Sequence, residues 1–510
     1  GNMDDRLDLT VAFDDNKFVG GSASAVNGAT TNNLAIYFAE PSLTTFAGRV
    51  DYTTGANAHG LISIDVNNDG KIDLINANYE GDTISVLLGN GDGSFANKVE
   101  YATGSKARGL TSADVNGDGK VDLVVTNADS DSVSVLINNG NGSFAGKVDF
   151  ATGDRPYGVT STDINNDGKA DLIAANQWSN TISVLLGNGN GSFANKIDYT
   201  VGGEPVGVAS ADVNNDGMID LIVSNRSSET VSVLINNGNG SFAAKRDIAV
   251  GRGPTGIVIA DVNGDGNGDL ITANLYGGPQ FGGTVSVLAG LGDGNFGPMV
   301  EYKLTNYSSP YFLTVADLNG DSKLDLVLAN NSRGTIAVLS NIGDGSFSKE
   351  IEYAVGIYPL NIASADFNGD GKMDVVVGHY REYDYTDAKL SVLLNTQDNS
   401  LSPDIDGDGI TNATENSAPG LWRDGVSPIL GDGNGDGIRD SSQNEITSVP
   451  FLGTSTAVSN PGSAPALYVT LVADAQAGLV DTTDGNSAVL TQLKQLDAPA
   501  DKPANIDMPL

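Results

Sequence analysis

Runs of β-branched and apolar residues recur along most of the chain and are separated by Gly, Asn and Asp. One unit contains four such runs, at residues 109–114, 122–127, 132–137 and 147–152. Runs of this length with these boundaries are typical of short β-strands. The pattern therefore predicts a unit of four consecutive strands.

The four-strand unit is repeated, and an acidic nonapeptide marks each copy. The first nonapeptide, Asp65–Asp73, reads Asp-Val-Asn-Asn-Asp-Gly-Lys-Ile-Asp. Five of the six intervals between copies are 49 residues and one is 56, and the later copies begin at Asp114, Asp163, Asp212, Asp261, Asp317 and Asp366. A four-strand unit repeated at about 40–50 residues is typical of a β-propeller, and neither β-helices nor helical solenoids fit this period. We therefore expect an all-β fold of four-stranded propeller blades.

A glycine-rich turn follows the third strand of most units. It is written Gly91–Phe95, Gly140–Phe144 and Gly189–Phe193 in three successive copies. Glycine adopts the positive φ angles of tight hairpins, and we expect the Phe to anchor the turn on the sheet. The glycine spacing superficially resembles a phosphate-binding loop. No helix follows it, so a dinucleotide site is not expected.

The number of blades depends on how the chain closes. Seven first strands favour seven blades, and the last unit, which ends near Asn395, lacks a fourth strand that Arg49–Thr54 could supply. Residues 1–9 align with the second half of an acidic loop, and strand-like Leu34–Phe38 follows, so we expect the chain to start within a repeat. Counting that fragment as a blade gives eight. An open last blade could also accept a strand from a neighbouring molecule.

The acidic nonapeptides carry the chemistry of a hard cation site. Asp occupies positions 1, 5 and 9, Asn occupies position 3, and Gly usually fills position 6, where a sharp turn is needed. Calcium takes six to eight oxygen ligands at about 2.3–2.6 Å, whereas magnesium prefers a tighter, water-rich octahedron. Side chains at positions 1, 3, 5 and 9 and the backbone carbonyl at position 7 could supply most of a calcium shell. The alternative, that the loops are only solvated turns, does not explain the repeated ligand order.

These positions give seven predicted ligand sets. They are Asp65, Asn67, Asp69, Lys71 and Asp73; Asp114, Asn116, Asp118, Lys120 and Asp122; Asp163, Asn165, Asp167, Lys169 and Asp171; Asp212, Asn214, Asp216, Met218 and Asp220; Asp261, Asn263, Asp265, Asn267 and Asp269; Asp317, Asn319, Asp321, Lys323 and Asp325; and Asp366, Asn368, Asp370, Lys372 and Asp374. In the sixth set Ser322 replaces the position-6 glycine. We expect that site to be weaker, because a positive φ is costly for Ser.

Composition narrows the possible functions. The formal net charge is −37. The three Asp of each acidic loop account for about a third of the 64 acidic residues, so we interpret much of the acidity as ligands for bound cations. No basic stripe is present, which argues against nucleic-acid binding. The chain has no Cys, so disulfides and thiol chemistry are excluded. No apolar run is long enough for a membrane span, and no secretion signal or anchor is visible in this chain.

The repeats resemble the FG-GAP/VCBS-type family, whose propellers occur in integrin α-subunits and in many bacterial surface proteins. The residues that carry the resemblance are the Asp-Val-Asn-Gly-Asp-Gly loops, the Gly-Ser-Phe turns and the Gly-x-x-Pro-x-Gly steps at Gly153–Gly158, Gly202–Gly207 and Gly251–Gly256. It covers roughly residues 4–395, so we assign residues 1–397 to the propeller. The resemblance implies a calcium loop between the first two strands of each blade. Low-affinity calcium loops favour an extracellular or cell-surface location.

The composition changes after residue 400. Asp404, Asp406, Asp408, Ile410, Asn412 and Glu415 follow the twelve-residue EF-hand ligand order. A second copy, with Asp432, Asn434, Asp436, Ile438 and Asp440, ends in Gln443 and should bind calcium more weakly. Pro403 and Pro419 argue against long flanking helices, and the loops resemble thrombospondin type 3 repeats. We assign residues 398–446 to a calcium-loop spacer and residues 447–510 to a small β-rich segment, which includes strand-like Leu467–Val472, with a polar tail.

The propeller face opposite the acidic loops is the predicted binding surface. Its loops vary from copy to copy, and two of them, at Tyr276–Gly283 and Tyr380–Ala388, are lengthened. Aromatic residues beside polar groups suit sugar stacking or protein contact, although they could simply cover loop backbone. The candidate ligand-binding residues are Trp178, Arg226, Tyr276, Phe281, Tyr380 and Tyr383.

No catalytic residues are predicted. His59 and His379 have no Cys partner and no nucleophile motif nearby, so we interpret them as ordinary loop residues. Spacing alone does not exclude hydrolysis by paired carboxylates. We therefore expect a non-enzymatic, calcium-binding surface propeller that acts in adhesion or in matrix or filament assembly. Its partner would be a surface glycan, a protein or other copies of itself; the alternatives are a lectin and a polysaccharide-degrading enzyme.

Overall fold

The computed structural model describes residues 6–14, 17–25, 36–37, 44–276, 282–305, 308–380, 389–396, 468–469 and 504–509. The chain divides into two compact units. One comprises Thr44–Gln397, and the other combines Gly1–Leu43 with Asp398–Leu510. All described elements are β-strands, and none of the described residues belongs to a helix that could span a bilayer.

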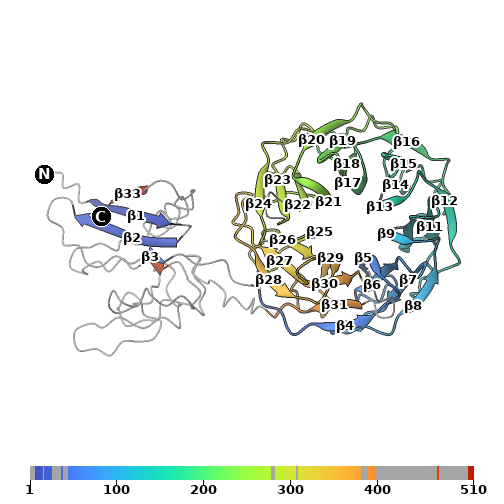
Figure 1. Cartoon of the computed structure of the whole chain (residues 1–510), viewed down its shortest axis with the longest axis horizontal. Coiled ribbons are helices and arrows are strands. Elements are labelled where there is room, and N and C mark those ends of the chain that lie inside the picture. The colour runs from blue at the N-terminus through green and yellow to red at the C-terminus, as the bar shows by residue number, and fades with distance from the viewer. Residues whose placement is uncertain are drawn as a thin grey trace. The chain divides into compact units, whose positions relative to one another are not determined.

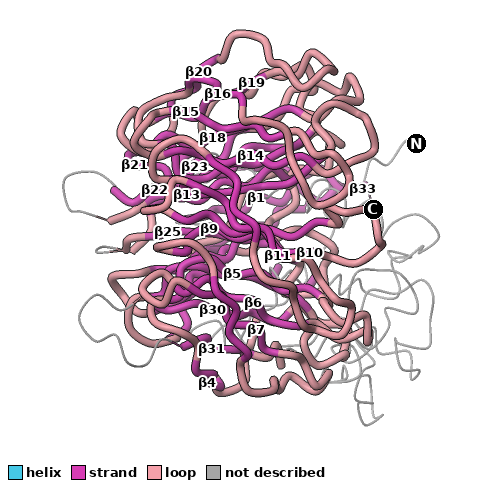
Figure 2. The backbone as a smooth tube through the Cα atoms, turned by 90° about the vertical axis from the view of Figure 1, so that its right-hand side faces the viewer, coloured by secondary structure: helices cyan, strands magenta, loops and turns pink. Residues whose placement is uncertain are grey.

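Residues of the first unit form a ring of seven antiparallel four-stranded blades (Figure 1). Within a blade the strands are hydrogen-bonded in chain order, and the first strand of each blade contacts the first strands of both neighbouring blades. Seen from the side, the strands make up the body of the ring and the loops extend on its two faces (Figure 2). The all-β propeller and the favoured count of seven blades are therefore confirmed.

The blades follow one another along the chain, and their bounds repeat closely. Blade 1 contains β5 (Ala58–Ile64), β6 (Asp73–Asn78), β7 (Thr83–Leu87) and β8 (Val99–Ala102). Blade 2 contains β9 (Ala107–Ala113), β10 (Asp122–Asn127), β11 (Ser132–Leu136) and β12 (Val148–Ala151). Blade 3 contains β13 (Pro156–Thr162), β14 (Asp171–Asn176), β15 (Thr181–Leu185) and β16 (Ile197–Thr200). Blade 4 contains β17 (Pro205–Ala211), β18 (Asp220–Asn225), β19 (Thr230–Leu234) and β20 (Arg246–Ala249).

The last three blades include the one that closes the ring. Blade 5 contains β21 (Arg252–Ala260), β22 (Asp269–Tyr276), β23 (Thr284–Leu288) and β24 (Val300–Lys303). Blade 6 contains β25 (Pro310–Ala316), β26 (Asp325–Asn330), β27 (Thr335–Leu339) and β28 (Ile351–Ala354). Blade 7 contains β29 (Pro359–Ala365), β30 (Asp374–His379) and β31 (Lys389–Leu393), and its fourth strand is β4 (Val50–Thr53).

Closure joins the two ends of the propeller segment. β4 pairs antiparallel with β31, so that Asp51 lies opposite Ser391. The amide of Thr396 also donates to the carbonyl of Thr45 at 2.7 Å. The predicted use of Arg49–Thr54 as the missing strand is confirmed, and no gap for a strand from another molecule is left in the described ring.

The core of the ring consists of hydrophobic layers between blades. Ile75 and Ile84 of blade 1 pack with Leu123 of blade 2, whereas Leu74 packs with Val376 of blade 7. Every pair of neighbouring blades encloses such a cluster among the described residues. Successive side chains of a strand point to opposite sheet faces, and both faces are covered here. The second strands are therefore buried along their whole length, apart from Tyr276 at the end of β22.

The Gly-x-x-Pro-x-Gly step has a steric explanation. A Cβ atom on Gly158 would lie 2.4 Å from the carbonyl oxygen of Val206 in the next blade. A Cβ atom on Gly153 would lie 2.7 Å from the side-chain nitrogen of Asn176. Both glycines therefore permit close approach, one between first strands and one over a buried Asn.

The second unit contains two small sheets among its described residues. β1 (Arg6–Asp14) pairs antiparallel with both β2 (Lys17–Ala25) and β33 (Ala504–Pro509). β3 (Ile36–Tyr37) pairs with β32 (Tyr468–Val469), so the two strand-like segments expected near residues 36 and 469 pair with each other. The structure thus differs from the expected propeller boundary at residue 1, because residues 6–14 pair with the C-terminal β33 and the described ring begins at Thr44.

Candidate functional site

The seven acidic loops share one backbone hydrogen-bond pattern. In the first loop, the carboxylate of Asp65 accepts the amides of Asp69 and Gly70 at 3.3 and 2.8 Å. Asn67 Oδ1 accepts the amide of Asp69 at 2.9 Å, and Asp69 Oδ1 accepts the amide of Lys71 at 3.0 Å. The same four contacts occur in the other six loops. The side chains at positions 1, 3 and 5 are therefore held within each loop.

Two positions of each loop have a left-handed backbone. Gly70 at position 6 has φ = 80°, and Ser322 at the same position of the sixth loop has φ = 64°. Ser322 therefore adopts the positive φ that is costly for Ser, and the weaker cation site there stays a prediction. Position 4 is also left-handed, as at Asn68 with φ = 58° and Gly117 with φ = 74°. The sequence carried a signal for this second turn, because only Asn or Gly occupies position 4.

The Asp at position 9 has a structural role that the sequence did not reveal. Asp73 is fully buried, and its two carboxylate oxygens accept the amides of Val66 and Gly89 at 2.9 and 2.8 Å. Burial raises the pKa of Asp73, and the nearby charges of Asp65 and Asp69 raise it further, although the two amides oppose the shift. In the last two loops burial raises the pKa of Asp325 and of Asp374 to about 6. Position 9 therefore ties its own loop to the third-to-fourth-strand hairpin of the same blade.

Each acidic loop is also hydrogen-bonded to the next blade through the carbonyl at position 2. The donor is a hairpin amide at Gly93, Gly191 and Gly294, and a buried Asn side chain at Asn138, Asn236, Asn341 and Asn395. The pairs, with the donor first, are Gly93–Phe367, Gly191–Val115, Gly294–Val213, Asn138–Val66, Asn236–Ile164, Asn341–Val262 and Asn395–Leu318. The loops thereby link all seven blades around one face of the ring.

The donor set of the loops suits a hard cation. Each loop offers carboxylates at positions 1, 5 and 9, an amide oxygen at position 3 and a carbonyl at position 7, and each carboxylate oxygen has lone pairs beyond its amide contact. In five loops a Lys at position 7 lies near the position-5 carboxylate, as in Lys120–Asp118 at 2.9 Å. Among the described residues, no group of three or more His, Cys, Asp or Glu side chains is arranged to hold a metal ion. The residues at 404–415 and 432–440 lie outside the described part of the chain.

The face opposite the acidic loops carries a cluster of aromatic and cationic side chains. Several of them come from the same position of different blades, which is the second residue of the first strand. His59, Arg108, Tyr157 and Tyr311 occupy this equivalent position in blades 1, 2, 3 and 6. The His59 ring lies 4.7 Å from that of Tyr79, 6.1 Å from that of Tyr157 and 5.4 Å from that of Tyr380. The Tyr157 ring lies 6.2 Å from Phe312 of blade 6. Aromatic contacts thus connect blades around this end of the ring.

Arg108 lies at the centre of this cluster. Its guanidinium carbon is 3.6 Å from the Tyr157 ring centroid and 5.6 Å from that of Tyr79, and its Nη1 donates to Gln177 Oε1 at 3.0 Å. Its Nε is buried without a hydrogen-bond partner among the described residues. Burial lowers the pKa of Arg108, and burial followed by the charge of Arg108 holds the pKa of His59 well below its usual value. Burial likewise raises the pKa of Tyr311 to about 12.

The residues predicted to bind a ligand are only partly brought together. Trp178 is 63% exposed and lies under the Arg155 guanidinium at 4.4 Å, and Tyr380 belongs to the cluster through His59. Tyr276 is 54% exposed, and Arg226 donates to Glu204 through Nε and Nη2. Phe281 and Tyr383 lie outside the described residues.

His59, Arg108 and Tyr157 of this cluster are not among the residues that the sequence predicts to bind a ligand. His59, Arg108 and Tyr157 are spaced 49 residues apart, and aligning the repeats would have shown that this position varies between constant neighbours. His59 and His379 were expected in loops, and this is wrong. They lie in β5 and β30, and both are buried.

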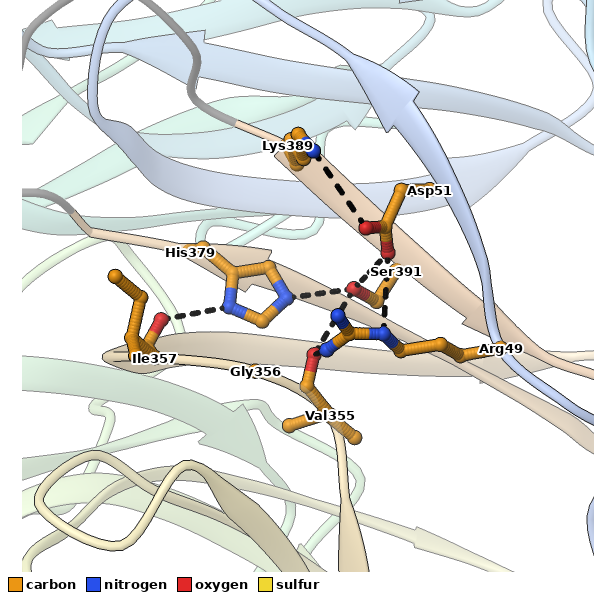
Figure 3. A pocket seen from close by; sticks show the side chains of 8 residues that line it. All are labelled: Arg49, Asp51, Val355, Gly356, Ile357, His379, Lys389 and Ser391. Atoms are coloured by element: carbon orange, nitrogen blue, oxygen red, sulfur yellow. Dashed lines mark hydrogen bonds and ion pairs between the residues drawn. The ribbon is translucent and has the colours of Figure 1, made fainter.

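His379 belongs to a polar node in the closing blade (Figure 3). Its Nε2 lies 2.8 Å from Ser391 Oγ, which lies 2.8 Å from Asp51 Oδ1, and its Nδ1 faces the Ile357 carbonyl at 2.9 Å. Arg49 and Lys389 also line the small cavity, of about 100 Å³, beside these residues. In a Ser-His-Asp triad the acid binds the His nitrogen remote from the Ser, whereas here the carboxylate faces the Ser.

The same node occurs in blade 2 with Asn in place of His. Asn127 Nδ2 lies 2.9 Å from Ser134 Oγ, which donates to Asp149 Oδ1 at 2.7 Å. His379 is therefore a variant of a structural element that connects the second, third and fourth strands of a blade.

Seven four-stranded blades with an acidic loop on one face of each define a repeat-built β-propeller. The FG-GAP-like repeat family matches residues 65–125, 114–174, 163–223, 212–272, 273–328 and 317–377. These matches span more than half of the chain, and the protein belongs to this family.

Comparison with other proteins gives distant structural similarities. No curated protein matches the chain. An Agrocybe aegerita lectin that recognises non-reducing terminal N-acetylglucosamine is 20% identical, with a TM-score of 0.41, over 58% of this chain and 80% of the lectin. BBS1N, in a complex with ARL6DN, is 12% identical, with a TM-score of 0.49, over 70% of this chain and 99% of that one. A catalytically inactive virginiamycin B lyase from Staphylococcus aureus is 14% identical, with a TM-score of 0.46, over 69% of this chain and 100% of the lyase chain.

Proposed function

We propose that this protein is a non-enzymatic, calcium-binding propeller that acts outside the cell or at its surface, in adhesion or in matrix or filament assembly. One observation supports this most: seven loops present the same oxygen-rich donor set with the same backbone geometry. Hard cations of flexible coordination prefer such a set.

The loops would act as stabilising elements. Bound calcium would offset the mutual repulsion of the carboxylates at positions 1, 5 and 9. The carboxylate at position 9 holds the hairpin of its own blade, and the carbonyl at position 2 accepts a hydrogen bond from the next blade. A loop that is fixed in this way supports the contact between two blades as well as its own turn.

The opposite face would then present the binding surface on a rigid scaffold. Its exposed Trp178 and Tyr276 and its clustered tyrosines suit contact with a surface glycan or a protein, and other copies of this chain are a further candidate partner. A lectin is the second candidate function, since exposed aromatic rings beside Arg side chains are typical sugar-stacking groups. The polysaccharide-degrading alternative would need an acid and a base placed on this face.

Calcium removal tests the proposal directly. Thermal unfolding is followed with about 1–10 mM calcium, with the same concentration of magnesium, and with chelator. We expect calcium to raise the melting temperature by several degrees or more, because binding to the folded state alone stabilises it. Calorimetric titration should show several sites, and the position-5 variant Asp118→Asn should lose one of them. Identical melting curves in calcium and in chelator would contradict the proposal.

A further inference from the structure

Three consecutive blades contribute to a cationic and aromatic group on the face opposite the acidic loops. Tyr79 follows the second strand of blade 1, Arg108 lies in the first strand of blade 2, and Arg155 precedes the first strand of blade 3. Arg155 Nη2 donates to Tyr79 Oη at 3.1 Å, and the Arg108 guanidinium lies 5.6 Å from the Tyr79 ring centroid. Two guanidinium groups therefore flank one tyrosine.

These two guanidinium groups have no carboxylate partner in the part of the chain that the structure describes. Arg226, Arg252 and Arg333 each form an ion pair with a Glu. Among the described residues, Arg108 and Arg155 form no ion pair, although the chain carries 64 acidic residues and only 27 basic ones. Within the described part of the chain, no carboxylate therefore neutralises their charge.

Aromatic rings orient both guanidinium groups. Arg108 lies 3.6 Å from the Tyr157 ring centroid, and Arg155 lies 4.4 Å from that of Trp178. Stacking on a ring occupies the face of a guanidinium and leaves the N–H groups at its edge, which match the two oxygens of a carboxylate. The buried Nε of Arg108 has no partner among the described residues, so Arg108 keeps hydrogen-bonding capacity unused.

The backbone at Arg155 has a conformation that the repeat imposes. Arg155 has φ = 53°, and the residue at this position is also left-handed in other blades, namely at Asn57, Lys106, Glu204, Gly253 and Tyr358. Because Gly adopts this conformation without strain, Gly can replace Arg155 without disturbing the backbone.

We propose that Tyr79, Arg108, Arg155, Gln177 and Trp178 form a binding site for an acidic sugar, with the two Arg side chains holding its carboxylate. The exposed Trp178 offers a platform for the sugar ring, and the buried Gln177 fixes Arg108 because its amide oxygen accepts a hydrogen bond from the guanidinium. The inference rests on the proposed function of this face as a binding surface and names its ligand class as uronate-containing saccharides.

Calorimetric titration of the full chain in calcium tests this assignment with three probes of similar length. The probes are an oligogalacturonate, a neutral malto-oligosaccharide and an acidic peptide. We expect the oligogalacturonate to bind at least tenfold more tightly than the neutral sugar. Equal binding of the two sugars, or binding of the acidic peptide alone, would overturn the assignment.

Three variants separate the proposed contact from general charge attraction. Arg155→Gly suits the left-handed backbone, Arg108→Met keeps the apolar stem over Tyr157, and each should weaken oligogalacturonate binding at least tenfold. Arg252→Gln removes the same charge from an exposed, Glu-paired Arg and should change the affinity less than twofold. An equal loss in Arg252→Gln would mean that only the net charge matters, which would overturn the site.

The outcome is distinguishable from failure of the proposed function. If calcium stabilises the chain and no saccharide binds, the calcium-loaded scaffold stands and the sugar site fails. If saccharide binds equally well and the melting curve is unchanged in chelator, the sugar site stands and the calcium role fails.

Discussion

Position 9 of the acidic loops shows how one residue can serve both the fold and a cation site. Asp122 is fully buried and accepts amides from Val115 and Asn138, so its charge is satisfied by the backbone before any ion binds. Asp118, at position 5 of the same loop, is exposed and contacts only loop groups, including Lys120. Both residues are expected cation ligands, but only the first is also part of the core.

Two substitutions in this loop should therefore behave differently. Asp122→Asn points an amide N–H₂ at a buried backbone donor and should lower the free energy of unfolding by about 1–3 kcal/mol, with or without calcium. Asp118→Asn should cause little change in chelator and should reduce stability only in calcium. Urea unfolding of both variants in the two conditions measures this. Equal effects of the two changes in chelator would show that position 9 has no separate structural role.

The sequence predicts correctly the residues whose backbone φ is determined by the turn in which they lie. The turn glycines and the strained Ser322 could be predicted because a tight turn restricts φ whatever surrounds it. The roles of Asp73 and Arg108 could not be predicted, because they depend on a hairpin 16 residues away and on a ring from the next blade. Composition identified these side chains as charged but did not indicate which groups they would meet.

At the scale of elements, the closing blade differs from the others in its buried polar node. His379 replaces the Asn found at the equivalent position of the second strand in blades 1–6. Asp51 of β4, Lys389 of β31 and Arg49, which precedes β4, line the cavity beside it. Burial lowers the pKa of His379 below its usual value of 6.5, although the Ile357 carbonyl and Asp51 partly oppose this.

This substitution makes closure sensitive to pH. A lowered folded-state pKa means that the stability from neutral His379 is present above about pH 6.5 and is lost as the pH falls through the folded-state pKa. His379→Asn should therefore lose less stability than the wild type between about pH 7.5 and pH 5.5. The urea unfolding midpoints of the wild type and of the variant at the two pH values measure this difference. His59 and the carboxylates are present in both proteins, so their contributions to the pH dependence cancel. A wild type and variant with the same pH dependence would contradict it.

Strand positions could be predicted from short apolar runs, but strand partners outside the repeats could not. The sequence predicts that β4 pairs with the last blade, because the last repeat lacks the fourth strand that the other repeats contain. No such phase exists for β1, which pairs with β33 almost 500 residues later in the chain. Because residues 1–9 resemble half an acidic loop, the sequence predicts that the chain starts within a repeat, whereas in the structure residues 6–14 pair with β2 and β33.

At the scale of the whole molecule, negative charge is concentrated around one face of the ring. The seven acidic loops lie on the same side, and in the first three loops burial, and then the charges of the Asp at positions 1 and 5, raise the pKa of the Asp at position 9. Repulsion of this kind destabilises the compact state and is screened by salt over about 10 Å at 0.1 M.

Salt should therefore stabilise the chain when calcium is absent. In chelator, we expect the melting temperature to rise by several degrees between low and moderate salt, whereas in saturating calcium it should change little. Tetramethylammonium chloride serves as a control for sodium chloride, because its large cation screens charge without fitting an oxygen-lined loop. A stabilisation seen only with sodium would indicate binding at the loops instead of screening.

Ring closure through β4 also determines where mechanical load passes through the molecule. The propeller segment enters at Thr45 and leaves at Thr396, and these two residues are hydrogen-bonded to each other. Tension applied between its two ends is therefore carried by that contact and by the β4–β31 pair. Blades 1–6 lie outside this path, so the group of Arg108, Arg155 and Trp178 is expected to keep its shape while blade 7 bears the strain.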